Sequence, residues 1–412
     1  MQSARTIDPP PWIGTVQART VFAALNDGDT RQTLYVGGCV RNHLLGLPVS
    51  DMDLATIHPP AEVIRRLQNA GLGFAPTGID HGTVTAISDG MVFEVTTLRR
   101  DVSTDGRRAV VAYTDDWRKD AERRDFTFNT LLMDPQGHVY DPLGLGLADL
   151  SARRVMFVGN PADRIREDYL RILRFFRFHG CYGEGPPDQA ALAACSAAAA
   201  GLQTLSRERI TQEILKILGL ERAAETLALM DDAQVLTKFY KADVSRDVVK
   251  SYFNLQTRYR AVDVVARLAA VAALDGELIE MNFSLSKAQI HFIGHLSAAM
   301  KQTQSLPWNE FHVRQLVYSF GNDVTVQVLL LQAAQIVGRA EALLSLLPQA
   351  KNWHPPVLPL TGADILAAGI KPGPVVGRIL GQAESWWRAA DFEPDRQACL
   401  LWLRQQLPGS VV

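Results

Sequence analysis

Two aspartates one residue apart, Asp51 and Asp53, are the residues of this 412-residue sequence that best suit a chemical reaction. They lie at the start of a β-rich run, Met52–Ile57, and side chains two residues apart on a strand point to the same face. Hard divalent cations such as Mg²⁺ bind carboxylate oxygens together with substrate phosphates. Two such ions, about 4 Å apart, stabilise the attacking and leaving oxygens of a phosphoryl-type displacement. The pair therefore predicts a site for two magnesium ions.

The sequence before this pair provides groups that suit a phosphate. Gly37 and Gly38 end a predicted strand, Thr33–Val36, and open a predicted helix. Glycines let the backbone approach a phosphate, and a helix start offers free N–H groups. Arg41 lies in the first turn of that helix. A second aspartate pair with the same spacing, in the sequence NDGD, lacks this context and is typical of a solvated turn.

A third carboxylate, Glu94, lies on a predicted strand that could neighbour the strand of the aspartate pair. Its position fits a metal ligand and an ordinary exposed strand residue equally well. The dipeptide Asp89-Gly90 predicts a two-residue hairpin turn between the runs 84–88 and 91–98.

Arginines form the second group of candidates. Arg124 precedes an apolar run and could contact a triphosphate, although a surface ion pair at a helix start is the ordinary explanation. Arg171, Arg174 and Arg177 follow Asp168 at steps of three, which predicts one ridge on a helix surface. One such pair is ordinary, but an unbroken line of three like charges is repulsive and favours an anionic partner.

The elements that must position these residues change along the chain. Residues 33–150 alternate between strand-like and helix-like runs, and the strand signal nearly vanishes after about residue 150. The segment 99–124 is polar and dense in both signs, which predicts a mobile excursion. Long stretches at helical period follow, including 162–180 and 323–346. We therefore expect a multidomain chain with an α/β head and an all-α remainder.

Composition excludes several classes of protein. The 47% of apolar and 21% of charged residues exclude a disordered chain, and the net charge of −2 excludes a globally basic nucleic-acid binder. No apolar stretch approaches the ~20 residues of a membrane span, and the start of the chain has no signal-peptide core. The four scattered cysteines form neither a zinc spacing nor a disulfide framework, so we expect a cytoplasmic protein without membrane association.

Several motifs, in their order along the chain, resemble one known family. They are GGCVRN and DMD within 37–53, HGTV at 81–84, FEVTTLR at 93–99, RRDFTFN at 123–129, DPLG at 141–144, IREDYLRILRFFRF at 165–178 and RERITQEILKIL at 207–218. Over about residues 34–219 the chain is similar to class II tRNA nucleotidyltransferases (CCA-adding enzymes) and bacterial poly(A) polymerases. Residues 361–380 resemble, more weakly, the tail of the tRNA nucleotidyltransferases.

The resemblance implies a polymerase-β-like nucleotidyltransferase head with a mixed sheet, followed by a helical neck, body and tail. The corresponding ranges are 1–150 for the head, 151–230 for the neck, 231–350 for the body and 351–412 for the tail. The segment 99–122 corresponds to the family's flexible loop. The implied substrates are CTP, ATP and the tRNA 3′ end, and the implied cofactor is Mg²⁺.

Residue roles follow from the same resemblance. Asp51 and Asp53 correspond to the metal ligands, and the family usually has Asp where this chain has Asn42, which keeps an oxygen but loses the charge. The triphosphate contacts correspond to Gly38, Arg41 and Arg124. The base-reading pair corresponds to Asp168 and Arg171, assisted by Arg174 and Arg177.

The chemistry of Asp168 and Arg171 agrees with such base selection, because an Asp accepts hydrogen bonds and an Arg donates them. Cytosine and adenine each offer an amino donor beside an acceptor, whereas uracil and guanine present an oxygen in place of the amino group. A buried mismatch of that kind costs about 1–3 kcal/mol. One such pair therefore accepts C and A and rejects U and G without a nucleic-acid template.

The tail sequence offers one candidate RNA contact. Thr361, with Asp364 three residues on, can cap a helix that ends near Gly369, and the Gly/Pro turn around Lys371 leads into another helix. Exposed backbone N–H groups and one lysine suit RNA phosphates. A plain interhelical turn fits equally well.

The expected activity is template-independent addition of CCA to the tRNA 3′ end by two-metal transfer, with release of diphosphate. Poly(A) polymerases and partial CC- or A-adding enzymes share these motifs. An inactive RNA-binding protein is disfavoured by the intact Asp51 and Asp53, and a small-molecule or protein nucleotidyltransferase by the long helical remainder. The sequence leaves the oligomeric state open.

Overall fold

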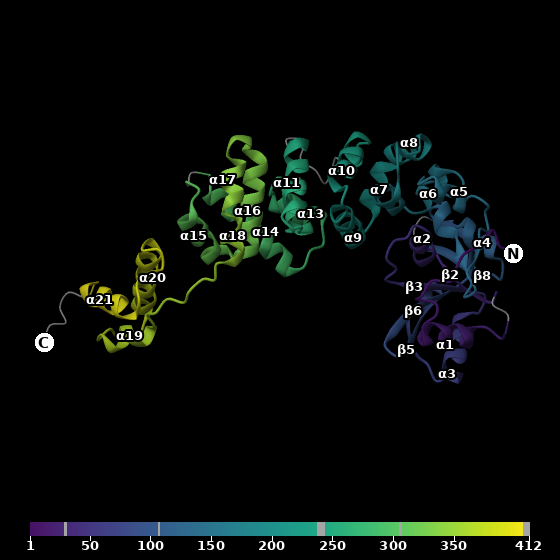
Figure 1. Cartoon of the computed structure of the whole chain (residues 1–412), viewed down its shortest axis with the longest axis horizontal. Helices are drawn as coiled ribbons and strands as arrows, with labels where there is room; N and C mark the ends of the chain where they lie inside the picture. Colours follow the sequence, from purple (N-terminus) through teal and green to yellow (C-terminus); the bar gives the residue numbers. More distant parts are fainter. Residues whose placement is uncertain (29–30, 106–107, 237–243, 305–306, 407–412) are drawn as a thin grey trace. The chain divides into compact units, whose positions relative to one another are not determined.

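The computed structural model describes residues 1–28, 31–105, 108–236, 244–304 and 307–406 (Figure 1). It divides into two compact units, Met1–Lys238 and Phe239–Val412. The first unit holds the sheet and a group of helices, and the second is helical. The expected α/β head followed by helices is confirmed, whereas the finer division into head, neck, body and tail stays a prediction.

The sheet of the first unit has eight strands in the order β1-β10-β9-β2-β3-β6-β5-β4. Neighbouring strands are antiparallel except β3 and β6, which pair in parallel, so the expected mixed sheet is confirmed. The strands are β1 (Arg5–Thr6), β2 (Thr33–Val36), β3 (Met52–Thr56), β4 (Gly73–Gly78), β5 (Thr83–Ser88), β6 (Met91–Thr97), β9 (Leu132–Met133) and β10 (His138–Tyr140).

One face of the sheet is covered by two helices. Helices α1 (Val16–Leu25) and α3 (Pro60–Asn69) pack against each other and against β4–β6. Buried residues alternate along β5 and β6, as Val84, Phe93 and Val95 illustrate, and this period of two fixes which face points inward. The residues between them, including Glu94, therefore point to the opposite face.

The hairpin between β5 and β6 agrees with the sequence. Ser88 pairs with Met91, and the two turn residues, Asp89 and Gly90, have φ of 48° and 79°. Positive φ at both central positions is the geometry that favours Asp-Gly, because its twist matches that of the flanking strands.

The segment 99–124 contains regular structure, and its mobility stays a prediction. Strands β7 (Arg99–Asp105) and β8 (Arg108–Tyr113) pair as a two-stranded antiparallel sheet, and helix α4 (Trp117–Glu122) follows. Asp116 caps α4 by accepting from the N–H groups of Arg118 and Lys119. A segment rich in charges of both signs thus forms a hairpin and a helix. Residues 106–107 lie outside the described residues.

The helical stretch predicted over 162–180 is two helices, α6 (Pro161–Glu167) and α7 (Leu170–Tyr182). The chain is extended at Asp168, with φ −155° and ψ 106°, and the Asp168 carboxylate accepts from the N–H of Leu170 at 3.1 Å. Asp is favoured at helix starts because its short side chain caps such N–H groups. The apolar periodicity of the sequence continues through this break, so the periodicity alone does not reveal where one helix ends and the next begins.

Within its described residues, the first unit holds five further α-helices. They are α2 (Gly38–Leu44), α5 (Gly146–Ser151), α8 (Gln189–Ala198), α9 (Arg207–Leu218) and α10 (Ala223–Asp232). Helix α7 packs on α9 and α10, and its buried face is aromatic, with Phe175 and Phe176 fully buried. This packing sets the arginine ridge of α7 beside the head.

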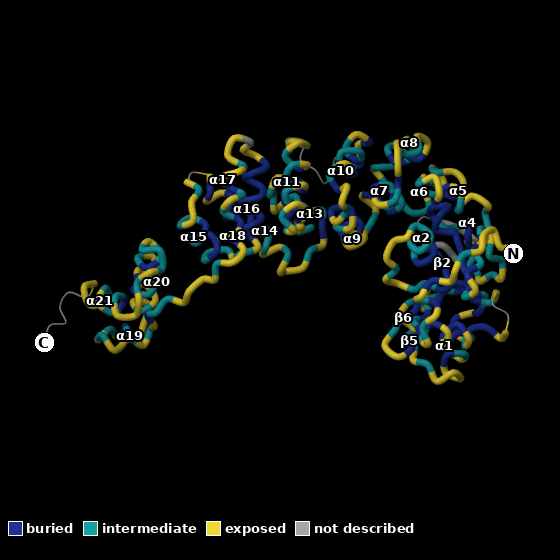
Figure 2. The backbone as a smooth tube through the Cα atoms, in the orientation of Figure 1, coloured by how far each residue is buried: buried dark blue, intermediate teal, exposed yellow. Residues whose placement is uncertain are grey.

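One part of the second unit is a set of helices around the buried α16, and residues 360–403 form a separate apolar core (Figure 2). The predicted stretch 323–346 is broken, because α16 (Asn322–Gln335) is followed by a short 3₁₀ turn and then by α17 (Ala340–Ser345). The remaining helices are α11 (Arg246–Arg258), α12 (Val264–Val271), α13 (Gly276–Asn282), α14 (Lys287–Gln302), α15 (Glu310–Phe320), α18 (Leu347–Asn352), α19 (Gly362–Ala367), α20 (Pro374–Ala389) and α21 (Arg396–Gln406).

Within the described ranges, no helix has the length and apolar character that crossing a membrane requires.

Gly137 and Gly90 form a matched pair of turn glycines that tests the sheet packing. Both glycines have a positive φ near 80°. A β-carbon on Gly137 would lie 2.1 Å from the carbonyl oxygen of Ile7, whereas a β-carbon on Gly90 would have no atom within 4 Å. Gly90→Ala should cost about 1 kcal/mol for the φ alone. Gly137→Ala should cost roughly 1–3 kcal/mol more, because the strand β1 segment must move. Thermal unfolding of both variants measures the difference, and equal unfolding temperatures would contradict the close approach.

Candidate active site

Three carboxylates lie on one face of the sheet. In the parallel pairing of β3 and β6, Asp53 is in register with Glu94, so the predicted neighbourhood of the two strands is confirmed (Figure 1). Asp51 lies directly before β3 and two residues from Asp53, which places it on the same side of the strand. This is the face opposite the one that α1 and α3 cover.

The electrostatics of this face favour a bound cation. Burial and the neighbouring Glu94 raise the pKa of Asp53 from 3.8 to about 6, and Arg124 and Arg41 only partly oppose this. Asp51 is exposed, and its carboxylate accepts a hydrogen bond from the Ser50 hydroxyl at 3.0 Å. Burial and the neighbouring carboxylate both disfavour the ionised form of Asp53, and a bound divalent cation would stabilise that form.

The donor set fits Mg²⁺ better than a metal held by protein alone. Among the described residues, no three or more His, Cys, Asp and Glu side chains form a cluster that could hold a metal ion. Mg²⁺ needs no such cage, because it is commonly bound by one or two carboxylates, substrate phosphates and water. Asp51 and Asp53, with Glu94 beside them, could supply these oxygens.

The two glycines lie between this carboxylate face and two arginines. A β-carbon on Gly38 would be 3.8 Å from Arg41 Nη2 and 4.0 Å from Asp53 Oδ2, and one on Gly37 would be 3.6 Å from Arg124 Nη1. Gly37 has a φ of 69°, which a residue with a side chain adopts only with strain. Because both positions lack a side chain, a ligand can approach the backbone between the charged groups.

Arg124 is anchored by a carboxylate that the sequence did not single out. Its Nη2 donates to Asp120 Oδ2 at 3.0 Å, and Arg123 Nε donates to Asp120 Oδ1 at 2.9 Å. Although burial opposes it, the two arginines lower the pKa of Asp120. Asp120, in the short helix α4, therefore forms an ion pair that holds Arg124 beside Gly37.

The arginine ridge of α7 has carboxylate partners within the chain. Arg171 Nη1 donates to Glu167 Oε2 at 2.7 Å, and Arg171 also donates to the carbonyl oxygens of Arg164 and Arg123. The two other ridge arginines pair with Asp125 and Glu213, at 2.7 and 2.6 Å from Arg174 Nε and Arg177 Nε. The repulsion between the three cations is thus relieved without a ligand.

Asp168 and Arg171 do not form the i,i+3 ion pair expected from the sequence. The Asp168 carboxylate instead accepts from Arg209 Nη2 at 2.8 Å, and Arg209 lies at the start of α9. The spacing argument assumed a continuous helix, whereas Asp168 lies in the break between α6 and α7. Arg209 falls in the RERITQEILKIL motif, but no spacing rule connects it with Asp168.

A chain of side-chain contacts joins the ridge to the glycine turn. Asp125 accepts from Arg174 and also from Asn129 Nδ2 at 3.0 Å, and Asn129 Oδ1 in turn accepts from Arg41 Nη1 at 2.6 Å. Burial opposes ionisation of Asp125, but Arg174 and these hydrogen bonds lower its pKa. The predicted triphosphate residue and the predicted neck arginine are therefore parts of one network.

The predicted turn of the tail lies between α19 and α20. Asp364 accepts from the backbone N–H of Thr361 at 2.8 Å, and Gly373 precedes α20 with a φ of 154°. Lys371 is exposed at this turn. The cap and the turn agree with the sequence, and the RNA role of Lys371 stays a prediction.

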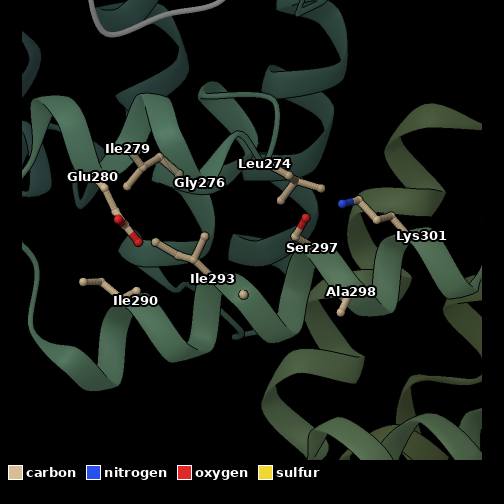
Figure 3. Close-up of a pocket in the computed structure, with 10 residues that line it drawn as sticks. Leu274, Gly276, Ile279, Glu280, Ile290, Ile293, Ser297, Ala298 and Lys301 are labelled. Atoms are coloured by element: carbon tan, nitrogen blue, oxygen red, sulfur yellow. The ribbon is translucent and has the colours of Figure 1, made fainter.

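The second unit carries a pocket that no predicted residue lines. It has a volume of about 310 Å³ and lies between α13, α14 and Leu274, which precedes α13 (Figure 3). Its lining is mostly aliphatic, with Ile279, Ile290 and Ile293 along it and Glu280 and Lys301 at its two ends in this view. It does not resemble the carboxylate and arginine site of the first unit.

Comparison with known proteins places this site in context. Residues 33–156 match the family model described as the poly(A) polymerase head domain, and residues 187–242 match the probable RNA- and SrmB-binding site of polymerase A. The mouse mitochondrial CCA tRNA nucleotidyltransferase 1 is 33% identical over 90% of this chain and 86% of its own length. The CCA-adding enzyme of Lacticaseibacillus paracasei is 31% identical over 86% of this chain and 87% of its own.

Solved structures share the fold over nearly the whole chain. The CCA-adding enzyme of Bacillus stearothermophilus, solved in complex with CTP, has a TM-score of 0.75 at 24% identity and covers 96% of this chain and 98% of that chain. The Thermotoga maritima enzyme, solved with tRNA, has a TM-score of 0.68 at 19% identity, covering 98% of this chain and 100% of that chain.

The poly(A) polymerase head, with its carboxylate face beside a double glycine, defines the class of this protein as a nucleotidyltransferase. Two CCA-adding relatives are more than 30% identical to this chain over most of its length. The chain therefore belongs to the CCA tRNA nucleotidyltransferase family, the family that its motifs resemble.

Asp53→Asn separates catalysis from folding. Because the pKa of Asp53 lies above its unfolded value, the ionised carboxylate costs stability at pH 7, and this cost fades as the pH falls below about 6. The amide removes the cost, so the unfolding temperature at pH 7 without Mg²⁺ should stay equal or rise. Turnover should fall roughly a thousandfold or more through loss of a metal ligand. Turnover close to wild type with Mg²⁺ present would contradict the metal assignment.

Proposed function

We propose that this enzyme adds CCA to the 3′ end of tRNA from CTP and ATP, without a nucleic-acid template and with release of diphosphate. The observation that carries the proposal is the carboxylate face of β3 and β6 beside Gly37 and Gly38, with two arginines at the glycines. The curated relatives are named for this activity, and solved neighbours contain CTP, ATP or tRNA. A cytoplasmic location stays a prediction, since the mouse relative is mitochondrial.

In the proposed mechanism, Asp51 and Asp53 hold Mg²⁺, with Glu94 as a third oxygen ligand or as a neighbour that tunes Asp53. When bound, two such ions supply charge stabilisation at the attacking 3′ oxygen and at the leaving diphosphate. The 3′ hydroxyl of the RNA attacks the α-phosphorus and loses its proton to solvent, a new P–O bond forms, and the bond from the α-phosphorus to the bridging oxygen breaks as diphosphate leaves. Arg41 and Arg124 orient the β- and γ-phosphates over the glycine turn.

Base selection is proposed for the junction of α6 and α7. Asp168 offers acceptor oxygens and Arg171 offers donors, and each now has another partner, Arg209 and Glu167. Exchange of these contacts for the edge of C or A keeps Asp168 and Arg171 hydrogen-bonded, whereas U or G would leave the Asp168 oxygens facing an oxygen. Arg174 and Arg177 support this edge through their pairs with Asp125 and Glu213.

Incubation of the enzyme with tRNA transcripts that end before C74, C75 or A76, with each nucleotide separately, tests the proposal. The expected result is CMP addition to the first two ends and AMP addition to the third. AMP runs on every end would identify a poly(A) polymerase, and addition restricted to C or to A would identify a partial enzyme. No incorporation into any transcript would favour an inactive RNA-binding protein.

Asp168→Ala tests base selection. Loss of the acceptor should reduce the preference for CTP over UTP by about 10- to 100-fold, because the mismatch costs about 1–3 kcal/mol. Asp163→Ala is the matched control, since Asp163 pairs with Arg166 in an exposed i,i+3 contact of the same helix pair. Single-nucleotide incorporation assays measure both ratios. An unchanged ratio in Asp168→Ala would remove this residue from base selection.

Lys371→Glu tests whether the tail holds RNA through its backbone. Phosphate contacts carry no sequence information, so binding of all tRNAs should weaken alike and the slope of log K against log salt should shrink by about one unit. The KM for CTP should not change, because the carboxylate face lies in the first unit. Filter binding over a salt series provides the measurement. Unaltered affinity at low salt would leave this turn a structural element only.

A further inference from the structure

The buried guanidinium of Arg41 lies among neutral oxygens and aromatic rings. Only 7% of Arg41 is exposed. Its Nε and Nη2 donate to Asn42 Oδ1 at 3.1 and 2.8 Å, and its Nη1 donates to Asn129 Oδ1 at 2.6 Å. Its Nη2 also donates to the Tyr182 hydroxyl at 2.8 Å. Every one of these acceptors is uncharged.

This surrounding differs from that of the other predicted nucleotide arginines. Each of those has a carboxylate within hydrogen-bond distance, as Asp120 is for Arg124 and Glu167 is for Arg171. Within the described part of the chain, Arg41 forms no ion pair, and burial lowers the pKa of its guanidinium. A buried cation that lacks an anionic partner is costly unless a ligand supplies the negative charge. The charge of Arg41 is thus available to a phosphate.

Tyr182 contacts both Arg41 and Asn42. It ends α7 and lies outside every motif of the sequence. Its hydroxyl accepts from Arg41 and donates to Asn42 Oδ1 at 3.2 Å, and its ring lies 4.3 Å from the guanidinium carbon. Tyr182 thus contacts Arg41 both by a hydrogen bond and by a cation–π contact.

The neighbours of Tyr182 fix its position. Its ring stacks on Phe178 with centroids 5.8 Å apart and meets Phe128 edge-on at 6.2 Å. Phe178 belongs to α7 and Phe128 to the RRDFTFN motif, so two different segments of the chain hold the ring. A rigid ring removes rotamer freedom from Arg41, which lowers the entropy lost when the arginine binds a ligand.

We propose that Tyr182 is a positioning residue that holds Arg41 for the triphosphate of the incoming nucleotide. The inference rests on the proposed function. An arginine has five N–H donors. Four hydrogen bonds occupy Nε, both Nη2 donors and one Nη1 donor, which leaves one Nη1 donor for a phosphate oxygen. The neutral Asn42, where a carboxylate would pair with Arg41, keeps the positive charge for that ligand.

Tyr182→Phe removes the hydroxyl and keeps the ring. The KM for CTP and for ATP should rise by the same factor, about tenfold, because Arg41 is no longer held in place and must be ordered when either nucleotide binds. The value of kcat should stay within about twofold, and the preference for CTP over UTP should not change. Tyr182→Leu also removes the ring and should raise both KM values further. A purely structural role would lower the unfolding temperature without this split between KM and kcat.

Tyr140→Phe is the matched control, because it removes a buried hydroxyl of the same unit that donates to Asp134 at 2.8 Å. Its KM values should equal those of the wild type. In an Arg41→Gln background, Tyr182→Phe should have little further effect on KM, since both act through one contact.

The outcomes separate this inference from the proposed function. Raised KM values in Arg41→Gln with unchanged KM values in Tyr182→Phe would overturn the role of Tyr182 and leave the function intact. Fully additive effects of the two substitutions would also overturn it. Failure of the wild-type enzyme to add CMP or AMP to any tRNA end would instead overturn the function itself.

Discussion

The parallel pairing of β3 with β6 is the constraint on which the site depends. In a strand, a shift of one residue moves every side chain to the opposite face. The buried alternation of β5 and β6 against α1 and α3 fixes that register, so Leu54 and Val95 pair toward the core and Asp53 and Glu94 pair away from it. The apolar core thereby decides where the carboxylates lie, and the chemistry uses the face that the core leaves free.

Charge is distributed unevenly around this face. Burial and repulsion from Glu94 both raise the pKa of Asp53 on this face. Most of the nearby arginines are neutralised by acids of their own chain, and Arg41 is held by neutral groups instead. Negative charge at the strands and positive charge at the glycine turn are therefore only partly compensated by each other. A magnesium–nucleotide complex carries both complementary charges at once.

Much of the head could be predicted from the sequence. Strands with strict alternation, the Asp89-Gly90 turn and the same-face aspartates depend on local rules of period and turn geometry, and the structure contains them. The hairpin of β7 and β8 was missed because its polar residues of both signs lack an apolar period. Short helices such as α13 and α18, with seven and six residues, give too little periodicity to be predicted.

Partners far apart in the sequence were beyond these rules. Arg174 and Asp125 are 49 residues apart, and Asp168 and Arg209 are 41 apart, so no spacing connects them. The break at Asp168 was hidden because the apolar pattern of α7 extends past it. The roles assigned to single residues, including Glu94 and Lys371, rest on chemistry and resemblance and await the experiments above.

One accessible thiol gives the molecule a natural attachment point. Cys181 is exposed, whereas Cys39, Cys195 and Cys399 are buried, and burial raises the pKa of these three thiols and so suppresses their reactive thiolates. A maleimide dye should therefore label one position in the native protein. That position adjoins Tyr182, so the fluorescence of a single label would report nucleotide arrival at Arg41 without any engineered cysteine.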